Sequence, residues 1–305
     1  MARDPCLTTG FRTGLSSAES QPNVALTRYE VRMPEQAHSP IQLIGEKFPY
    51  TKIEVSKAAQ KLYDAWIGSL VKRIKSGEDR NDICREALSD LYGADKGSLI
   101  LNAQFDPRNV TLEPEYYGDC DMPRFLERKP LLWLWYMFDK SPAGLNLDFG
   151  FKFRRALAPF IFKKVGKNFK CFPFVEFTFG YNLEVGDDVV FHRWVFIDDR
   201  CSVKIGSHTS LSDYVNVYSH THDINCRYFV SNLPTVIGSN CRVTYHSTVL
   251  AGTKMADNSM LGACGLLTRE TRQDAVYVGI PAKKVKDKDP RHHCRPGDHP
   301  DETIT

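Results

Sequence analysis

The segment IGSHTSLSDYVNVYSHTH, residues 205 to 222, has an apolar residue at every sixth position: Ile205, Leu211 and Val217. Four further triplets continue this spacing, and all of their positions are apolar as well. The other twelve are Val165, Cys171, Phe177, Val185, Phe191, Ile197, Ile237, Val243, Val249, Met255, Leu261 and Leu267. In a chain with 42% apolar residues, fifteen such matches would occur by chance at roughly 2 in a million. A spacing of six fits neither a helix nor an ordinary strand, and it predicts a structural repeat.

A six-residue repeat is typical of a triangular solenoid, in which each hexapeptide forms one short strand and one corner. Eighteen residues complete one coil, and the repeated apolar residue points into the prism. The predicted coils are 165–182, 185–202, 205–222, 237–254 and 255–272. The intervening segment 223–236 should protrude as a loop. We therefore predict a mainly β fold, a parallel β-helix of about five coils within residues 161–286.

The residues outside the repeat divide into three parts. Residues 1–45 are polar and contain prolines without periodicity, which predicts disorder. Residues 46–160 should form a helical and irregular region, with two helices over 51–93 from their apolar spacing and no assignable pattern over 100–160. Residues 287–305 should be a flexible tail. Its His292, His293, Cys294 and His299 match no standard spacing of metal ligands, so no metal site is predicted.

The composition is that of an ordinary globular protein. A net charge of +3 gives no argument for nucleic-acid binding. Nine cysteines without CxxC pairs, and the lack of a signal peptide, predict reduced thiols in a cytoplasmic protein. The longest apolar run, PLLWLWYMF at 130–138, is too short to span a bilayer.

From 165 to 286 the chain resembles the hexapeptide-repeat acyltransferases, most closely the branch of maltose and galactoside O-acetyltransferases. The ending GIPAKKVK, Gly279 to Lys286, is especially similar. The resemblance implies a left-handed β-helix, a homotrimer with active sites at its seams, and acetyl transfer from acetyl-CoA to a hydroxyl of a sugar or glycan-like acceptor. Transfer to an amino-sugar or similar amine is an alternative. A non-catalytic trimeric scaffold, or a metal-binding solenoid like the γ-carbonic anhydrases, is another.

The stretch HTHD at 220–223 contains the candidate catalytic residues. An alcohol must lose its proton as it attacks a thioester, and an imidazole suits that task near neutral pH. The family has one histidine with this role at the junction with the loop, and the resemblance favours His222 over His220. Asp223 and the Asp198–Asp199 pair are candidates for the carboxylate that would orient the ring. The alternative to a catalytic role is that these histidines lie in an ordinary solvated turn.

The resemblance also implies acceptor and coenzyme sites. The galactoside enzymes carry an acceptor-binding asparagine at a position that matches roughly 191–193, where this chain has Phe191, His192 and Arg193. The candidate acceptor-binding residues are therefore His192, Arg193 and Asp198. Small residues that would let the pantetheine arm approach the backbone are Gly252, Ala263, Gly265 and Thr268. Lys283 and Lys284 would meet the 3′-phosphate, while Arg242-Val243-Thr244 replaces the family's usual WIG.

An aromatic and basic stretch precedes the repeat and has no counterpart in the small sugar acetyltransferases. It includes Trp133, Trp135, Phe153, Arg154, Arg155, Lys163 and Lys164. One reading is a hydrophobic cap under the first coil, because an open solenoid end must be covered. The other is a platform for a large or lipid-linked acceptor, or a peripheral contact with an anionic membrane.

Overall fold

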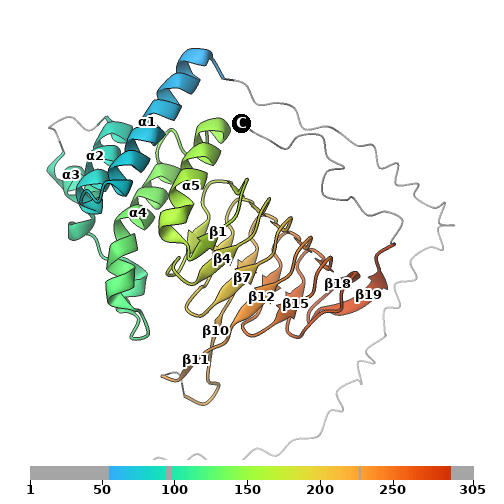
Figure 1. Ribbon diagram of the computed structural model, residues 1–305. Helices are drawn as coiled ribbons and strands as arrows, with labels where there is room; N and C mark the ends of the chain where they lie inside the picture. The colour runs from blue at the N-terminus through green and yellow to red at the C-terminus, as the bar shows by residue number, and fades with distance from the viewer. Residues whose placement is uncertain (1–54, 94–97, 227, 290–305) are drawn as a thin grey trace, which may run out of the picture. The chain divides into compact units, whose positions relative to one another are not determined.

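The computed structural model of the chain describes residues 55–93, 98–226 and 228–289. Within this part a group of helices is followed by a stack of short strands (Figure 1). The predicted disordered segment 1–45 and the histidines of the predicted tail lie outside the described residues.

The helical part contains five α-helices and two 3₁₀ turns in the described ranges. They are α1 (Lys57–Lys75), α2 (Arg80–Tyr92), α3 (Leu99–Phe105), η1 (Pro107–Asn109), η2 (Glu113–Tyr116), α4 (Met122–Lys140) and α5 (Leu147–Ile161). Each α-helix begins at a residue whose side chain accepts a backbone N–H bond, which satisfies a free helix-end donor. The two helices predicted over 51–93 are α1 and α2, and α2 ends at Gly93 in the left-handed conformation.

Residues 100–160, for which the sequence shows no assignable pattern, are largely helical. One reason is that α4 buries consecutive residues, Lys129, Pro130, Leu131 and Leu132, so its apolar residues follow no single stripe. Pro130 lies inside α4 and Pro159 inside α5, which further weakens the helical signal.

The solenoid has three parallel sheets, one for each face of the prism. The first face contains β1 (Lys164–Val165), β4 (Leu183–Val185), β7 (Val203–Ile205), β12 (Thr235–Ile237) and β15 (Lys254–Met255). The second contains β2 (Lys170–Cys171), β5 (Val190–Phe191), β8 (Ser210–Leu211), β13 (Arg242–Val243), β16 (Met260–Leu261) and β18 (Ala275–Val278), with β19 (Lys283–Asp287) added antiparallel. The third contains β3 (Glu176–Phe177), β6 (Phe196–Ile197), β9 (Asn216–Val217), β14 (Thr248–Val249) and β17 (Leu266–Leu267).

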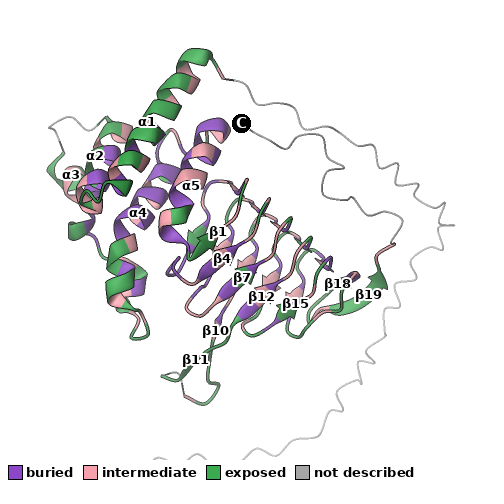
Figure 2. Ribbon diagram, viewed as in Figure 1, coloured by how far each residue is buried: buried purple, intermediate pink, exposed green. Residues whose placement is uncertain are grey.

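This topology confirms the predicted β-helix. Five coils are complete, because each gives one strand to each face, and β18 adds a strand of a sixth. Of the fifteen predicted inward positions, fourteen are buried, and Val165 is half-buried at the end of the stack. Figure 2 shows this buried lining along the inside of the coils.

Two of the three corners are built from residues in the left-handed region, three positions after each inward residue. The first corner carries Asn168, Asp188, His208, Asn240 and Asn258. Asn and Asp suit this conformation because their side chains are short and polar. Asn168 also donates to Asp188 of the next coil at 2.8 Å.

The second corner carries a ladder of larger side chains, which we call the corner ladder: Phe174, Trp194, Tyr214, His246 and Cys264. The ring centroids of Phe174 and Trp194 are 4.3 Å apart, and those of Tyr214 and His246 are 4.7 Å apart, with nearly parallel planes. Stacking along the prism therefore offsets the backbone strain of bulky residues at positive φ.

The third corner is irregular, and a β-hairpin leaves it after the third coil. Its strands are β10 (His220–His222) and β11 (Val230–Asn232), which pair antiparallel. The prediction that the chain protrudes here is confirmed, but the predicted boundary is wrong. The hairpin begins at His220 and not after His222, because Leu233 donates its N–H to Ser219 O at 2.7 Å and closes the neck there.

The helices cover the first coil, as the cap reading of the aromatic stretch predicts. Trp135, Phe153 and Arg154 are buried in one core with the solenoid. Arg154 pairs with Asp139 and donates to the carbonyl oxygens of Gly144 and Cys171 at 2.9 and 3.1 Å. These three residues therefore cannot form a platform for an acceptor or a membrane.

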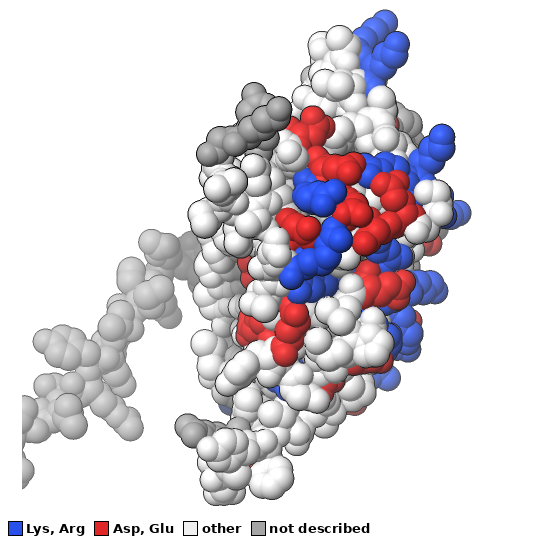
Figure 3. Space-filling model, turned by 90° about the vertical axis from the view of Figure 1, so that its left-hand side faces the viewer, with Lys and Arg blue, Asp and Glu red and all other residues white. Residues whose placement is uncertain are grey.

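The exposed charges of the helical part are also mixed in sign. Figure 3 shows Lys and Arg interspersed with Asp and Glu on this face. Arg73 pairs with Glu78 and Glu86, and Arg108 pairs with Asp82. Such a surface does not favour an anionic membrane. Among the described helices, none combines the length and the apolar character needed to cross a bilayer.

Candidate active site

A histidine and a buried aspartate meet at the third corner of the solenoid. Nδ1 of His220, the first residue of the hairpin, lies 2.5 Å from Oδ2 of Asp198. Asp198 follows Ile197, the last inward residue of the second coil, so the solenoid places it one coil below the hairpin. The His220 side chain is 18% exposed, and that of Asp198 is 1% exposed.

The Asp198 carboxylate is held rigidly by its neighbours. Oδ2 accepts the backbone N–H groups of Ser219 and His220 at 3.0 and 3.2 Å. Oδ1 accepts the Thr178 hydroxyl at 3.2 Å and the Arg200 N–H at 3.4 Å. A carboxylate fixed in this way accepts the Nδ1 hydrogen of His220 and leaves Nε2 with its lone pair. Asp198, a candidate both for the acceptor site and for orienting the ring, is thus the partner of a histidine.

His222, the histidine that the family resemblance favours, has a different environment. It is exposed, and its ring centroid lies 5.2 Å from that of His220 at an interplanar angle of 81°. Asp223 does not orient it, because Asp223 Oδ1 accepts the N–H groups of Asn225 and Cys226, each at 2.8 Å, in the hairpin turn. The geometry therefore favours His220 over His222, against the sequence-based preference.

Asp199 has a structural role in the solenoid and is not part of the pair that His220 and Asp198 form. It is fully buried and accepts the N–H groups of Phe179, Gly180 and Asn182 at 2.7 to 3.0 Å. Burial raises the pKa of Asp199 to about 6, even though these hydrogen bonds favour the charged form. Its carboxylate replaces the missing backbone partners of an irregular corner.

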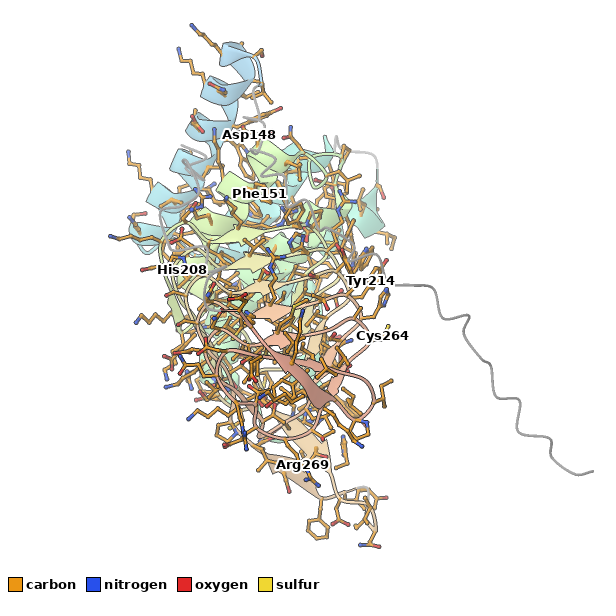
Figure 4. The ribbon with its side chains drawn as sticks, turned by 90° about the vertical axis from the view of Figure 1, so that its right-hand side faces the viewer. Asp148, Phe151, His208, Tyr214, Cys264 and Arg269 are labelled. Atoms are coloured by element: carbon orange, nitrogen blue, oxygen red, sulfur yellow. The ribbon has the colours of Figure 1, made fainter. Side chains whose placement is uncertain are left out.

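The predicted acceptor residues His192 and Arg193 lie at the second corner of the same chain. His192 stacks on Phe172 at 4.8 Å, and burial lowers its pKa. Arg193 is exposed next to the corner ladder. Figure 4 shows Tyr214 and Cys264 of this corner opposite His208 of the first corner, with Arg269 of the third corner away from both. One chain therefore does not bring His192 and Arg193 to His220.

The predicted coenzyme residues are divided between the second and the third corner. Gly252 and Thr268 are exposed at the third corner, whereas Ala263 is exposed at the second. Gly265 is buried, and a Cβ there would lie 2.7 Å from Leu261 Cδ1 and 2.8 Å from Gly262 O. Packing of the turn therefore explains Gly265 without a ligand.

The two predicted phosphate-binding lysines lie on β19. Both Lys283 and Lys284 are exposed, and Lys284 Nζ is 2.5 Å from Asp287 Oδ1. Across the residues the structure describes, no group of three or more His, Cys, Asp or Glu side chains is placed to hold a metal ion.

Sequence analysis does not identify a network of three residues beside the pair of His220 and Asp198. Asp119, from the loop before α4, bonds to Arg200 and to Asn232 of β11. The three residues are far apart in sequence, and Asp119 lies in a stretch without a recognised counterpart. Of the three, only Arg200 lies next to residues that the sequence singles out, the Asp198–Asp199 pair.

Comparison with known proteins agrees with the fold and the repeat. No family model matches the chain. The galactoside O-acetyltransferase of Escherichia coli strain K12 is 26% identical over 149 residues, which are 47% of this chain and 73% of that protein. The solved maltose O-acetyltransferase from Clostridium difficile 630 has a TM-score of 0.50 at 24% identity, and the match covers 57% of this chain and 92% of that one. A solved galactoside acetyltransferase in complex with coenzyme A has a TM-score of 0.51 at 22% identity, over 57% and 86% of the two chains. The six-residue repeat, the triangular coils and this likeness to named acetyltransferases together support a hexapeptide-repeat acetyltransferase.

Proposed function

We propose that this acyltransferase moves an acetyl group from acetyl-CoA to a hydroxyl of a sugar or glycan-like acceptor, with His220 as its general base. The observation that carries the proposal is the 2.5 Å contact between His220 Nδ1 and the buried Asp198 Oδ2. A solvated turn histidine would have no such partner. A purely structural scaffold would have no need to desolvate a carboxylate beside an imidazole.

The chemistry follows from the free Nε2 of His220. Nε2 takes the proton of the acceptor hydroxyl. At the same time the hydroxyl oxygen attacks the thioester carbonyl carbon and forms the new C–O bond. The C–S bond then breaks, and the imidazolium returns the proton to the leaving CoA thiolate. Asp198 keeps the ring in the correct tautomer and stabilises its positive charge between the two steps.

The choice of acetyl-CoA and of a hydroxyl acceptor rests on the relatives. The similar Escherichia coli and Clostridium difficile proteins are named O-acetyltransferases, and one similar structure contains coenzyme A. The exposed Ala263 and Thr268 remain our proposed pantetheine contacts, and Lys283 remains the proposed phosphate contact.

The proposed site also needs a second copy of the chain. His220 lies at the third corner, whereas His192 and Ala263 lie at the second. A ring of three copies would place the second corner of one against the third corner of the next. Both corners carry exposed apolar groups that such a contact would cover: Trp194 and Tyr214, each 45% exposed, and on the hairpin Ile224 and Phe229, 97% and 68% exposed. These surfaces support a homotrimer with shared sites.

The test is an acetyl-transfer screen over sugars, amino-sugars and lipid-linked glycans, with the His220→Ala variant as the blank. We expect transfer to hydroxyl acceptors and a loss of roughly 10²- to 10⁴-fold in His220→Ala, the usual effect of a positioned general base. His222→Ala is the matched control and should lose much less. Preferential transfer to amines would replace the O-acetyl assignment. Absence of both transfer and coenzyme binding would leave the scaffold.

A further inference from the structure

One carboxylate of the helical part, that of Asp119, bonds to two residues that flank the pair of His220 and Asp198. Asp119 accepts two bonds from the Arg200 guanidinium, at 3.0 Å from Nε and 2.7 Å from the terminal nitrogen Nη2. Asp119 Oδ2 also accepts a bond from Asn232 Nδ2 at 2.9 Å. Asp119 therefore joins the loop before α4, the third corner and the hairpin.

The two partners of Asp119 are the immediate neighbours of the pair. Arg200 is two residues beyond Asp198, and its N–H donates to Asp198 Oδ1. Asn232 is the residue directly opposite His220 in the register of β10 and β11. Asp119 is thus linked through Arg200 to Asp198, and through Asn232 to the strand position opposite His220.

The contact is well shielded for a surface group. The Arg200 side chain is 7% exposed, and its guanidinium lies 4.4 Å from the centre of the Tyr117 ring. Partial burial alone would raise the pKa of Asp119, but the bonds from Arg200 and Asn232 outweigh it and lower the pKa below its ordinary value. Bidentate pairs of this kind fix geometry as well as charge.

The hairpin needs such a fixing point. It is a two-stranded ribbon that projects from the corner, and an isolated ribbon is marginally stable. Its residues 228–230 are exposed, and so is His222. Among the described residues, Asn232 of β11 bonds to the helical part through the side chain of Asp119.

We propose that Asp119 is a positioning residue for acyl transfer: it holds the corner through Arg200 and the hairpin through Asn232, so that His220 stays against Asp198. This inference rests on the proposed function of His220. It assigns to the helical part, beyond its role as a cap, a role in the precision of the site.

The experiment compares Asp119→Asn with Glu184→Gln in the full-length chain. Glu184 is the matched control, because it also ties the start of the solenoid to a neighbouring cation, Lys163 at 2.7 Å, away from the third corner. Two readouts are used: kcat and KM for acetyl transfer, and hydrogen exchange of the amides in 220–222 and 230–232. The exchange readout needs no acceptor, so a failure of the hairpin contact can be told apart from a failure of the proposed function.

In Asp119→Asn we expect faster exchange in both hairpin strands and a kcat lower by roughly 10- to 100-fold, since small misplacements of a catalytic group have effects of this size. The KM for acetyl-CoA should change by less than about twofold, because Asp119 is not among the proposed coenzyme contacts. Glu184→Gln should change neither readout. Asn232→Ala, which removes one arm only, should shift both readouts in the same direction by a smaller amount. It serves as the test if Asp119→Asn does not fold. Unchanged hairpin exchange in both variants would overturn the proposal, and so would faster exchange without any loss of kcat in an active enzyme.

Discussion

Asp198 Oδ2 lies 2.5 Å from His220 Nδ1, although 22 positions separate the two residues in sequence. The repeat explains the meeting. One coil and its connection bring the end of β6 beside the end of β9, and these strands pair in parallel. A residue just after the inward position of one coil therefore faces the chain just after the inward position of the next, where the hairpin departs.

Replacement of Asp198 by asparagine should show how much its charge contributes to catalysis by His220. In Asp198→Asn the side chain keeps its shape but loses the charge that stabilises the imidazolium. It also presents an amide group to the backbone donors of Ser219 and His220. We expect kcat to fall by roughly 10²- to 10⁴-fold. The control is Asp187→Asn, an aspartate of the same coil whose Oδ1 accepts the Lys167 N–H at 2.7 Å at the first corner. Full activity in Asp198→Asn would remove Asp198 from the mechanism.

The pH dependence of stability should carry the signature of Asp199. Burial raises its pKa in the folded protein to about 6, above the ordinary value near 3.9. Between about pH 4 and pH 6 the folded state thus holds a proton that the unfolded state has lost, and stability decreases as the pH rises. The free energy of unfolding of the wild type, minus that of Asp199→Asn, should fall by about 3 kcal/mol over this range. Above it the difference should be level. Urea unfolding at several pH values measures this difference, and an increase with pH would contradict the assignment.

The sequence predicts the solenoid well because a single spacing sets its interior. Each inward residue is followed six positions later by another, so the faces could be predicted without knowledge of the contacts. The site is less predictable, because it lies where the repeat is interrupted. His220 and His222 lie on the same hairpin strand, and the contact of His220 with Asp198, which depends on the packing of two coils, distinguishes them. Asp119 could not be predicted at all, since its role depends on how the helical part packs beside the third corner.

Replacement by alanine should change the stability in opposite directions at two glycines, Gly265 and Gly68. A Cβ at Gly265 would lie 2.8 Å from the carbonyl oxygen of Gly262, a backbone atom that cannot move freely. We expect Gly265→Ala to destabilise the chain by about 1–3 kcal/mol. Gly68 lies inside α1, and a Cβ there meets nothing within 4 Å. Gly68→Ala should stabilise by about 0.5–1 kcal/mol through helix propensity. Urea unfolding compares both with the wild type. A tolerated Gly265→Ala that loses coenzyme binding would instead support a ligand contact there.

The corner ladder should be essential for assembly if the second corner meets the third corner of a neighbouring copy. Wild-type protein should scatter light as three times the 34.7 kDa of one chain. Trp194→Glu places a charge in the middle of the ladder, on a side chain that is 45% exposed in the single chain. A buried unpaired carboxylate costs several kcal/mol, so the trimer should dissociate while each chain keeps its solenoid and its far-UV spectrum. Tyr116→Glu is the control, because Tyr116 is 89% exposed on η2 in the helical part; it should leave the mass unchanged.

The dissociated Trp194→Glu chain should also lose acetyl transfer, because His220 would be separated from the second corner of its neighbour. A monomeric variant with full activity would show that one chain contains the whole site.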